Sequence, residues 1–237
     1  MLETFFTRVA VPEFLKPEFA KDDWYLVIAK LKGILEKQIN QTELRSSGKN
    51  LSVNGKVYIG SDCVIGENVV IDGPVYIGEQ VEIGPGAYIR PGSVIGDKCS
   101  IGHAAEVKNA VMMEGSKVAN HCFLGDSIIG ANARLGGHCE TANRHFVQSP
   151  IEFCYEDIKL ATGLDKLGMI LGENSRLGGG VFTAPGSMIG MKTFVGTMSA
   201  ISGFIPAGQF VKTDFALKIV PNNFNGELKH TELFERV

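Results

Sequence analysis

An unbroken period of six residues constrains the fold of this chain more than any other feature. Aliphatic residues occupy ten consecutive sixth positions, namely Val53, Ile59, Ile65, Ile71, Ile77, Ile83, Ile89, Ile95, Ile101 and Val107. A small or β-branched residue stands four positions after each of them. A period of six fits neither an α-helix nor an isolated amphipathic strand. It is typical of a hexapeptide solenoid, in which short strands and tight turns stack into a parallel β-helix.

Beyond this run the repeat continues with two short steps and one long interruption. The aliphatic frame slips by one residue before Met112 and again before Ile129. Residues 143–169 keep no period, after which the frame resumes. We therefore predict a solenoid over residues 51–206, with ~18 residues in each of roughly seven coils. We expect residues 143–169 to be an excursion loop with a functional role, because long loops without structure of their own are usually functional.

The flanking segments have ordinary composition. Within an N-terminal extension, 1–50, apolar residues at helical spacing predict an amphipathic helix over 22–39, followed by a polar linker. The apolar face of this helix must pack against the solenoid or a neighbouring subunit. We expect the C-terminal tail, 207–237, to cap the last coil or to cross to another subunit.

Composition excludes several classes of partner. The net charge is −3 and there is no long basic run, so neither nucleic acid nor a membrane surface is an expected partner. No apolar run reaches the ~18 residues of a membrane span. The N-terminal residues do not resemble a secretory signal, and we expect a cytoplasmic protein. Four of the five cysteines, Cys63, Cys99, Cys122 and Cys139, fall at the small position of the repeat and are expected to be reduced core residues.

Three sequence runs carry a closer resemblance. IRPGSVIGDKCSIGHAAEVKNA, EGSKVANHCFLGDSIIG and ETANRHF resemble the C-terminal acetyltransferase domain of the bifunctional N-acetylglucosamine-1-phosphate uridyltransferase and its archaeal sugar-1-phosphate nucleotidylyltransferase relatives. The resemblance implies a left-handed β-helix that forms a homotrimer, with sites in clefts between adjacent prisms. It also implies acetyl-CoA as co-substrate, no metal, and a sugar phosphate or sugar nucleotide of cell-envelope biosynthesis as acceptor. The sequence has no Gly-rich nucleotide loop, so we do not expect uridylyl transfer.

The resemblance implies a role for several residues. Arg90 in the RPG motif and Lys108 in EVKN match phosphate-binding cations, and an Arg fork and a Lys charge on successive coils can share one phosphate or diphosphate. The alternative is that both are solvated corner charges. Further matches are Asn143 at the acetyl-transfer centre, Lys166 in the loop that closes over the sugar, and Gly179 and Thr197 along the pantetheine arm of acetyl-CoA.

The chain departs from the family pattern at three positions of the expected pocket. The family's catalytic His corresponds to Asn120, its Tyr to Phe123, and its sugar-contacting Asn to Arg134. These changes indicate a different acceptor, a displaced base or lost activity. We take the neighbouring His121 as the provisional general base.

His121 belongs to a predicted column of imidazoles. His138 has the same phase one coil later, and His103 lies one coil earlier and one residue out of phase. Stacked coils lie ~4.8 Å apart, so the three rings can stack. A metal site of the γ-carbonic-anhydrase type and a polar stripe at a subunit seam are alternatives to a general base. His145, in the excursion loop, is a second candidate base.

We therefore expect an acetyltransferase that moves an acetyl group from acetyl-CoA to a phosphorylated amino sugar or sugar nucleotide. The alternatives are a non-catalytic sugar-nucleotide-binding or assembly module of the same fold and, in a third class, a metal-dependent lyase.

Overall fold

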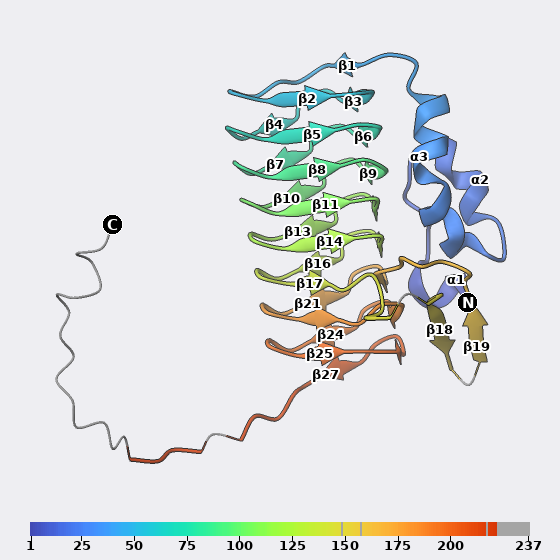
Figure 1. Ribbon diagram of the computed structural model, residues 1–237, viewed down its shortest axis with the longest axis vertical. Helices are drawn as coiled ribbons and strands as arrows, with labels where there is room; N and C mark the ends of the chain where they lie inside the picture. The colour runs from blue at the N-terminus through green and yellow to red at the C-terminus, as the bar shows by residue number, and fades with distance from the viewer. Residues whose placement is uncertain (148, 157, 217, 222–237) are drawn as a thin grey trace.

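The structure is a computed structural model that describes residues 1–147, 149–156, 158–216 and 218–221. The chain forms a left-handed parallel β-helix in which a complete coil contributes one strand to each of three sheets. Figure 1 shows the coils stacked into a prism with the helices along one side. The predicted all-β hexapeptide solenoid with an N-terminal helix and an excursion loop is confirmed.

Sheet A faces the N-terminal helices (Figure 1). Its nine parallel strands are β1 (Glu43–Leu44), β3 (Val57–Ile59), β6 (Val75–Ile77), β9 (Ser93–Ile95), β12 (Val111–Met112), β15 (Ile128–Ile129), β20 (Met169–Leu171), β23 (Ser187–Ile189) and β26 (Phe204–Ile205).

Sheets B and C form the other two faces of the prism. The eight strands of sheet B are β4 (Val64–Ile65), β7 (Glu82–Ile83), β10 (Ser100–Ile101), β13 (Lys117–Val118), β16 (Arg134–Leu135), β21 (Arg176–Leu177), β24 (Phe194–Val195) and β27 (Phe210–Val211). The eight strands of sheet C are β2 (Ser52–Asn54), β5 (Val70–Asp72), β8 (Tyr88–Arg90), β11 (Glu106–Lys108), β14 (Phe123–Gly125), β17 (Glu140–Thr141), β22 (Phe182–Thr183) and β25 (Ala200–Ile201).

The stack begins earlier than the sequence period indicates. Sheet A has nine strands where roughly seven coils were predicted, partly because β1 lies inside the predicted polar linker and pairs with β3. Side-chain hydroxyls replace the missing strand contacts at this end. The Thr42 hydroxyl donates to the Gly55 carbonyl (2.8 Å), and the Ser46 hydroxyl donates to the Gly60 carbonyl (2.9 Å). These bonds satisfy backbone groups that have no preceding coil.

The inside of the prism is an apolar ladder. Ile71, Ile89 and Val107 are in parallel register on successive coils and are fully buried. The small position of the repeat fills the remaining space inside the prism, which is why Cys99, four residues after the buried Ile95, is also buried. Burial raises the pKa of the Cys99 thiol to about 11, so it stays protonated and unreactive near neutral pH.

A helical layer covers sheet A. It consists of α1 (Leu2–Phe5), η1 (Glu13–Leu15), α2 (Lys16–Phe19), η2 (Trp24–Leu26) and α3 (Val27–Gln38). The predicted helix over 22–39 therefore starts as a 3₁₀ turn and becomes α-helical at Val27. Its apolar face is buried against this chain's own solenoid, where Leu31 joins the core formed with the outward side chains Val94, Val111, Ile128, Ile170 and Met188 of sheet A.

The excursion loop is partly ordered as an antiparallel hairpin of β18 (Glu152–Tyr155) and β19 (Ile158–Ala161). Phe153 is fully buried and meets the Tyr25 ring edge-on at a centroid distance of 5.0 Å. The hairpin therefore extends the cover of sheet A, as Figure 1 shows. Most of the predicted tail 207–237 lies outside the described residues. Among the described residues, no helix has both the length and the apolar character to cross a membrane.

The apolar interior predicts which substitutions lower the stability of the fold. Ile89→Ala should lower the free energy of unfolding by about 2–5 kcal/mol, because it leaves a cavity in a core that cannot collapse along the stack. Val64→Ala, at a side chain 66% exposed on the outer surface, is the matched control and should change it by less than about 0.5 kcal/mol. Urea unfolding measures both, and equal losses would contradict this account of the core.

Candidate functional site

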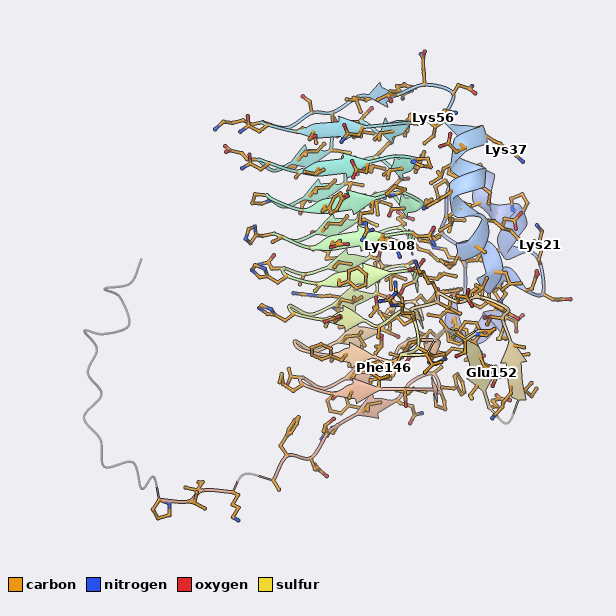
Figure 2. All side chains as sticks on the ribbon, in the orientation of Figure 1. Lys21, Lys37, Lys56, Lys108, Phe146 and Glu152 are labelled. Atoms are coloured by element: carbon orange, nitrogen blue, oxygen red, sulfur yellow. The ribbon has the colours of Figure 1, made fainter. Side chains whose placement is uncertain are left out.

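The predicted phosphate-binding cations lie side by side at the turn from sheet C into sheet A. We call this turn, residues 90–93, 108–111 and 125–128 on three successive coils, the C–A corner. Arg90 and Lys108 are direct partners in the parallel register of β8 and β11. Figure 2 shows Lys108 at the edge of the coil stack on the side of α3. The stacking that the sequence predicted is therefore present.

A buried carboxylate organises this corner. Asp126 is 4% exposed and accepts hydrogen bonds from Lys108 Nζ (2.9 Å), Asn109 Nδ2 (2.8 Å) and Asn143 Nδ2 (2.6 Å). It thereby joins the predicted phosphate lysine to the predicted acetyl-orienting amide. Sequence reasoning missed both Asp126 and Asn109.

The two short steps of the repeat explain this cluster. Each shortened corner contains a residue in the left-handed region, Asn109 with φ 47° and Asp126 with φ 48°. Asn and Asp tolerate this conformation better than other non-glycine residues. Because the steps fall on adjacent coils at the same corner, the two side chains meet. The slipped frame before Met112 and Ile129 was the sequence signal that locates them.

Both predicted phosphate ligands are already paired with carboxylates. Arg90 bonds Glu106 at 2.6 Å, with side chains 37% and 35% exposed. Lys108 is 17% exposed and pairs with the nearly inaccessible Asp126. A phosphate would therefore have to displace Glu106 from Arg90 or share Lys108 with Asp126.

A cleft of about 420 Å³ opens beside Lys108. One wall comes from the C–A corner, a second from Leu164–Lys166 of the excursion loop, and a third from Ile28, Ala29 and Lys32 of α3. Lys166 also lines a neighbouring cleft of about 660 Å³ with Arg144, His145, Phe146 and Asp165. The structure thus brings the predicted loop lysine to the same region as Lys108 and Asn143.

Phe123 belongs to the same region. The Phe123 ring and the Asn143 amide both lie over Gly125, where a Cβ atom would come within 2.7 Å of the ring and 2.9 Å of the amide nitrogen. Glycine at this position therefore lets the two side chains approach each other across sheet C.

The histidines occupy the opposite edge of sheet C, at the turn from sheet B into sheet C, which we call the B–C corner. The His121 ring lies 5.0 Å from that of His103 and 5.1 Å from that of His138, between centroids. All three side chains are exposed. Asn120 instead caps the corner, because its Oδ1 accepts a bond from the His103 backbone N–H at 2.9 Å. In the described part of the chain, no cluster of three or more His, Cys, Asp or Glu residues is arranged to hold a metal ion.

The remaining predicted residues also lie away from Lys108. Gly179 and Thr197 follow His138 at the B–C corner on the next two coils, where backbone hydrogen bonds connect these turns. Arg134 is on sheet B, in register between Lys117 and Arg176. Asp126 follows His121 by five positions across sheet C, an extended span of ~16 Å. A single chain therefore does not bring His121 and Asn143 together.

Comparisons with known proteins place this fold in a family. Residues 71–193 match the family described as the GMPPB C-terminal domain. The chain belongs to this family. The matched span includes the whole C–A corner and the histidines, but not the helical layer. The predicted resemblance to hexapeptide-repeat acyltransferases is thereby confirmed.

Named relatives cover part of the chain. It is 34% identical over 107 residues to the uncharacterized acetyltransferase YaiX of Escherichia coli O6:K15:H31, covering 45% of this chain and 46% of that protein. It is 35% identical over 108 residues to the bifunctional protein GlmU of Methanococcus aeolicus, covering 46% and 26%. The chain therefore matches less than half the length of these relatives. A hexapeptide transferase family protein from Anaplasma phagocytophilum superposes with a TM-score of 0.40 at 18% identity, covering 66% of this chain and 80% of that one.

The carboxylate of Asp126 and the ammonium group of Lys108 should be energetically coupled. Asp126→Asn should lower the free energy of unfolding by about 1–3 kcal/mol, because one amide oxygen cannot satisfy three donors. In combination with Lys108→Met the loss should be smaller than the sum of the single losses, because the lysine no longer needs a partner. A double-mutant cycle by chemical unfolding measures the coupling, and strictly additive losses would contradict it.

Proposed function

We propose that this protein transfers an acetyl group from acetyl-CoA to an amine or hydroxyl of a phosphorylated amino sugar or sugar nucleotide. The convergence of Lys108, Asn143 and Lys166 around the C–A corner is the observation that carries this proposal. The family membership and the named acetyltransferase relatives support acyl transfer as the reaction class. We propose a cytoplasmic location.

In this proposal the C–A corner holds the acceptor. Arg90 and Lys108 bind its phosphate, and Lys166 closes over the sugar from the excursion loop. Asn143, fixed by Asp126, donates to the acetyl carbonyl oxygen, where negative charge develops during transfer. Phe123 provides an apolar surface beside it.

The B–C corner supplies the base and the cofactor track. Acetyl-CoA lies along the turns of Gly179 and Thr197, and His121 accepts a proton from the acceptor amine or hydroxyl. The acceptor nitrogen or oxygen forms a bond to the acetyl carbon, the thioester C–S bond breaks, and coenzyme A leaves as the thiol after taking up a proton.

The separation of the two corners is the reason we propose a homotrimer. The helical layer packs on sheet A and leaves sheets B and C uncovered. Part of one outward row on sheet B is basic, and part of one outward row on sheet C is acidic. Lys117, Arg134 and Arg176 align on sheet B, whereas Glu106 and Glu140 alternate with Phe123 on sheet C. Prisms packed through these faces would bring a B–C corner of one chain to the C–A corner of the next.

The oligomeric state tests this packing. Light scattering at micromolar concentration should give a mass near three times the 25.6 kDa chain, and Arg134→Glu should shift the mass toward the monomer by placing like charges in the interface. A monomeric wild-type protein would contradict the shared site.

The phosphate ligands can be tested by binding. Arg90→Ala and Lys108→Ala should each weaken binding of an amino-sugar phosphate by ~1.5–3 kcal/mol, the size of a lost charge-assisted hydrogen bond. Their effects should be non-additive if they share one phosphate. Calorimetric titration measures the affinities, and unchanged affinity in both variants would overturn the assignment.

The base can be tested by turnover. In a screen of amino-sugar phosphates and UDP- or dTDP-amino sugars with acetyl-CoA, His121→Ala should lower kcat by ~10²–10⁴ with KM little changed. His145→Ala is the comparison, because His145 is the candidate base on the Asn143 side. A loss confined to His145→Ala would transfer the role to the loop.

The same screen separates the enzyme from a binding module. If the wild-type protein binds a sugar nucleotide without turnover and Asn120→His creates turnover, the chain is a binding module derived from an enzyme.

A further inference from the structure

Besides its apolar packing on sheet A, helix α3 is hydrogen-bonded to the candidate site through one side chain. Asn109 Nδ2 donates to the Ile28 carbonyl (3.1 Å) and to Asp126 Oδ1 (2.8 Å). The same amide therefore ties the helix to the carboxylate that holds Lys108 and Asn143. The wall of the cleft formed by α3 is therefore joined by a hydrogen bond to the C–A corner, although α3 lies outside the span that matches the family.

Lys32 projects from this wall. It follows Ile28 by four residues and so lies on the same face of α3. Its Cγ would lie 3.2 Å from a Cβ placed on Gly92, so the aliphatic part of Lys32 crosses the RPG turn two residues after Arg90. Gly92 has φ +87°, which also favours glycine there. The turn therefore guides the Lys32 stem toward the cleft that Lys108 lines.

The lysines of the cleft differ in how their charge is balanced. Lys108 is held by the buried Asp126 at 2.9 Å. Across the described residues, neither Lys32 nor Lys166 lies within ion-pair distance of a carboxylate, although both line the cleft with Lys108. The cleft also contains the exposed Asp165, so its net formal charge is positive by one (three lysines against two aspartates). Two unpaired ammonium groups facing one cleft favour a ligand with more than one anionic group.

We infer that Lys32 and Lys166 form a second anion subsite beside Lys108, so that the cleft binds a diphosphate in preference to a single phosphate. This inference rests on the proposed function and narrows it. Both a sugar nucleotide and coenzyme A carry a diphosphate, and the experiment separates these two sources. The helical layer would then set the ligand class, because Lys32 comes from a segment outside the family match.

The test compares inorganic phosphate with inorganic pyrophosphate by calorimetric titration at constant ionic strength. The wild-type protein should bind pyrophosphate about tenfold or more tightly than phosphate. Lys32→Gln and Lys166→Gln should each weaken pyrophosphate binding about tenfold and change phosphate binding by less than about twofold. Lys37→Gln is the matched control, because Lys37 is exposed on the same helix but does not line the cleft, and it should change neither affinity.

The outcomes distinguish this inference from the proposed function. If Lys108→Gln weakens both ligands but Lys32→Gln weakens neither, the phosphate site stands and the diphosphate subsite is overturned. If neither variant changes either affinity, both are overturned. Equal losses in Lys32→Gln and Lys37→Gln would reduce the effect to general surface charge and also overturn the subsite. Displacement of bound pyrophosphate by UDP-N-acetylglucosamine but not by coenzyme A assigns the subsite to the acceptor, and the reverse assigns it to the cofactor.

Discussion

A parallel hydrogen-bond register between successive coils aligns equivalent side chains along the whole prism. Each coil pairs with the next at equivalent positions, so Ile71, Ile89 and Val107 stack inside while Arg90 and Lys108 stack outside. The backbone hydrogen bonds between two coils therefore position a side chain and the equivalent side chain on the next coil together. These bonds join residues that are about one coil apart in sequence and adjacent in space. Equivalent side chains therefore form columns along the prism, and a binding site can draw its residues from one column.

Irregularity in the repeat is concentrated at one corner. Both shortened steps fall at the C–A corner, and the excursion 143–169 leaves the stack there on the next coil. At the shortened turns the side chains of Asn109 and Asp126 meet. The end of the excursion loop brings Lys166 to the cleft at the same corner. The opposite B–C corner stays regular and stacks His103, His121 and His138. In the proposed function, the regular corner holds the extended cofactor and the irregular corner holds the acceptor.

The features that could be predicted from the sequence are those that follow from the six-residue repeat. The inward aliphatic residues, the buried cysteines of the small position and the Arg90–Lys108 stacking required only counting by six. Asp126 escaped prediction because its partners lie on the coils before and after its own and meet only after folding. Lys32 escaped because helix docking on sheet A depends on tertiary packing. The separation of His121 from Asn143 escaped because a motif match preserves order along the chain but not position around the prism.

The proposed function depends on binding of a phosphorylated ligand at the C–A corner. A crystal structure of the protein soaked with uridine diphosphate would show where the ligand binds, because phosphorus positions can be located without assumptions about turnover. We expect a phosphate within hydrogen-bond distance of Lys108 Nζ, in the cleft formed with α3 and the excursion loop. Phosphate density confined to the histidines of the B–C corner, with the C–A cleft unchanged, would contradict it.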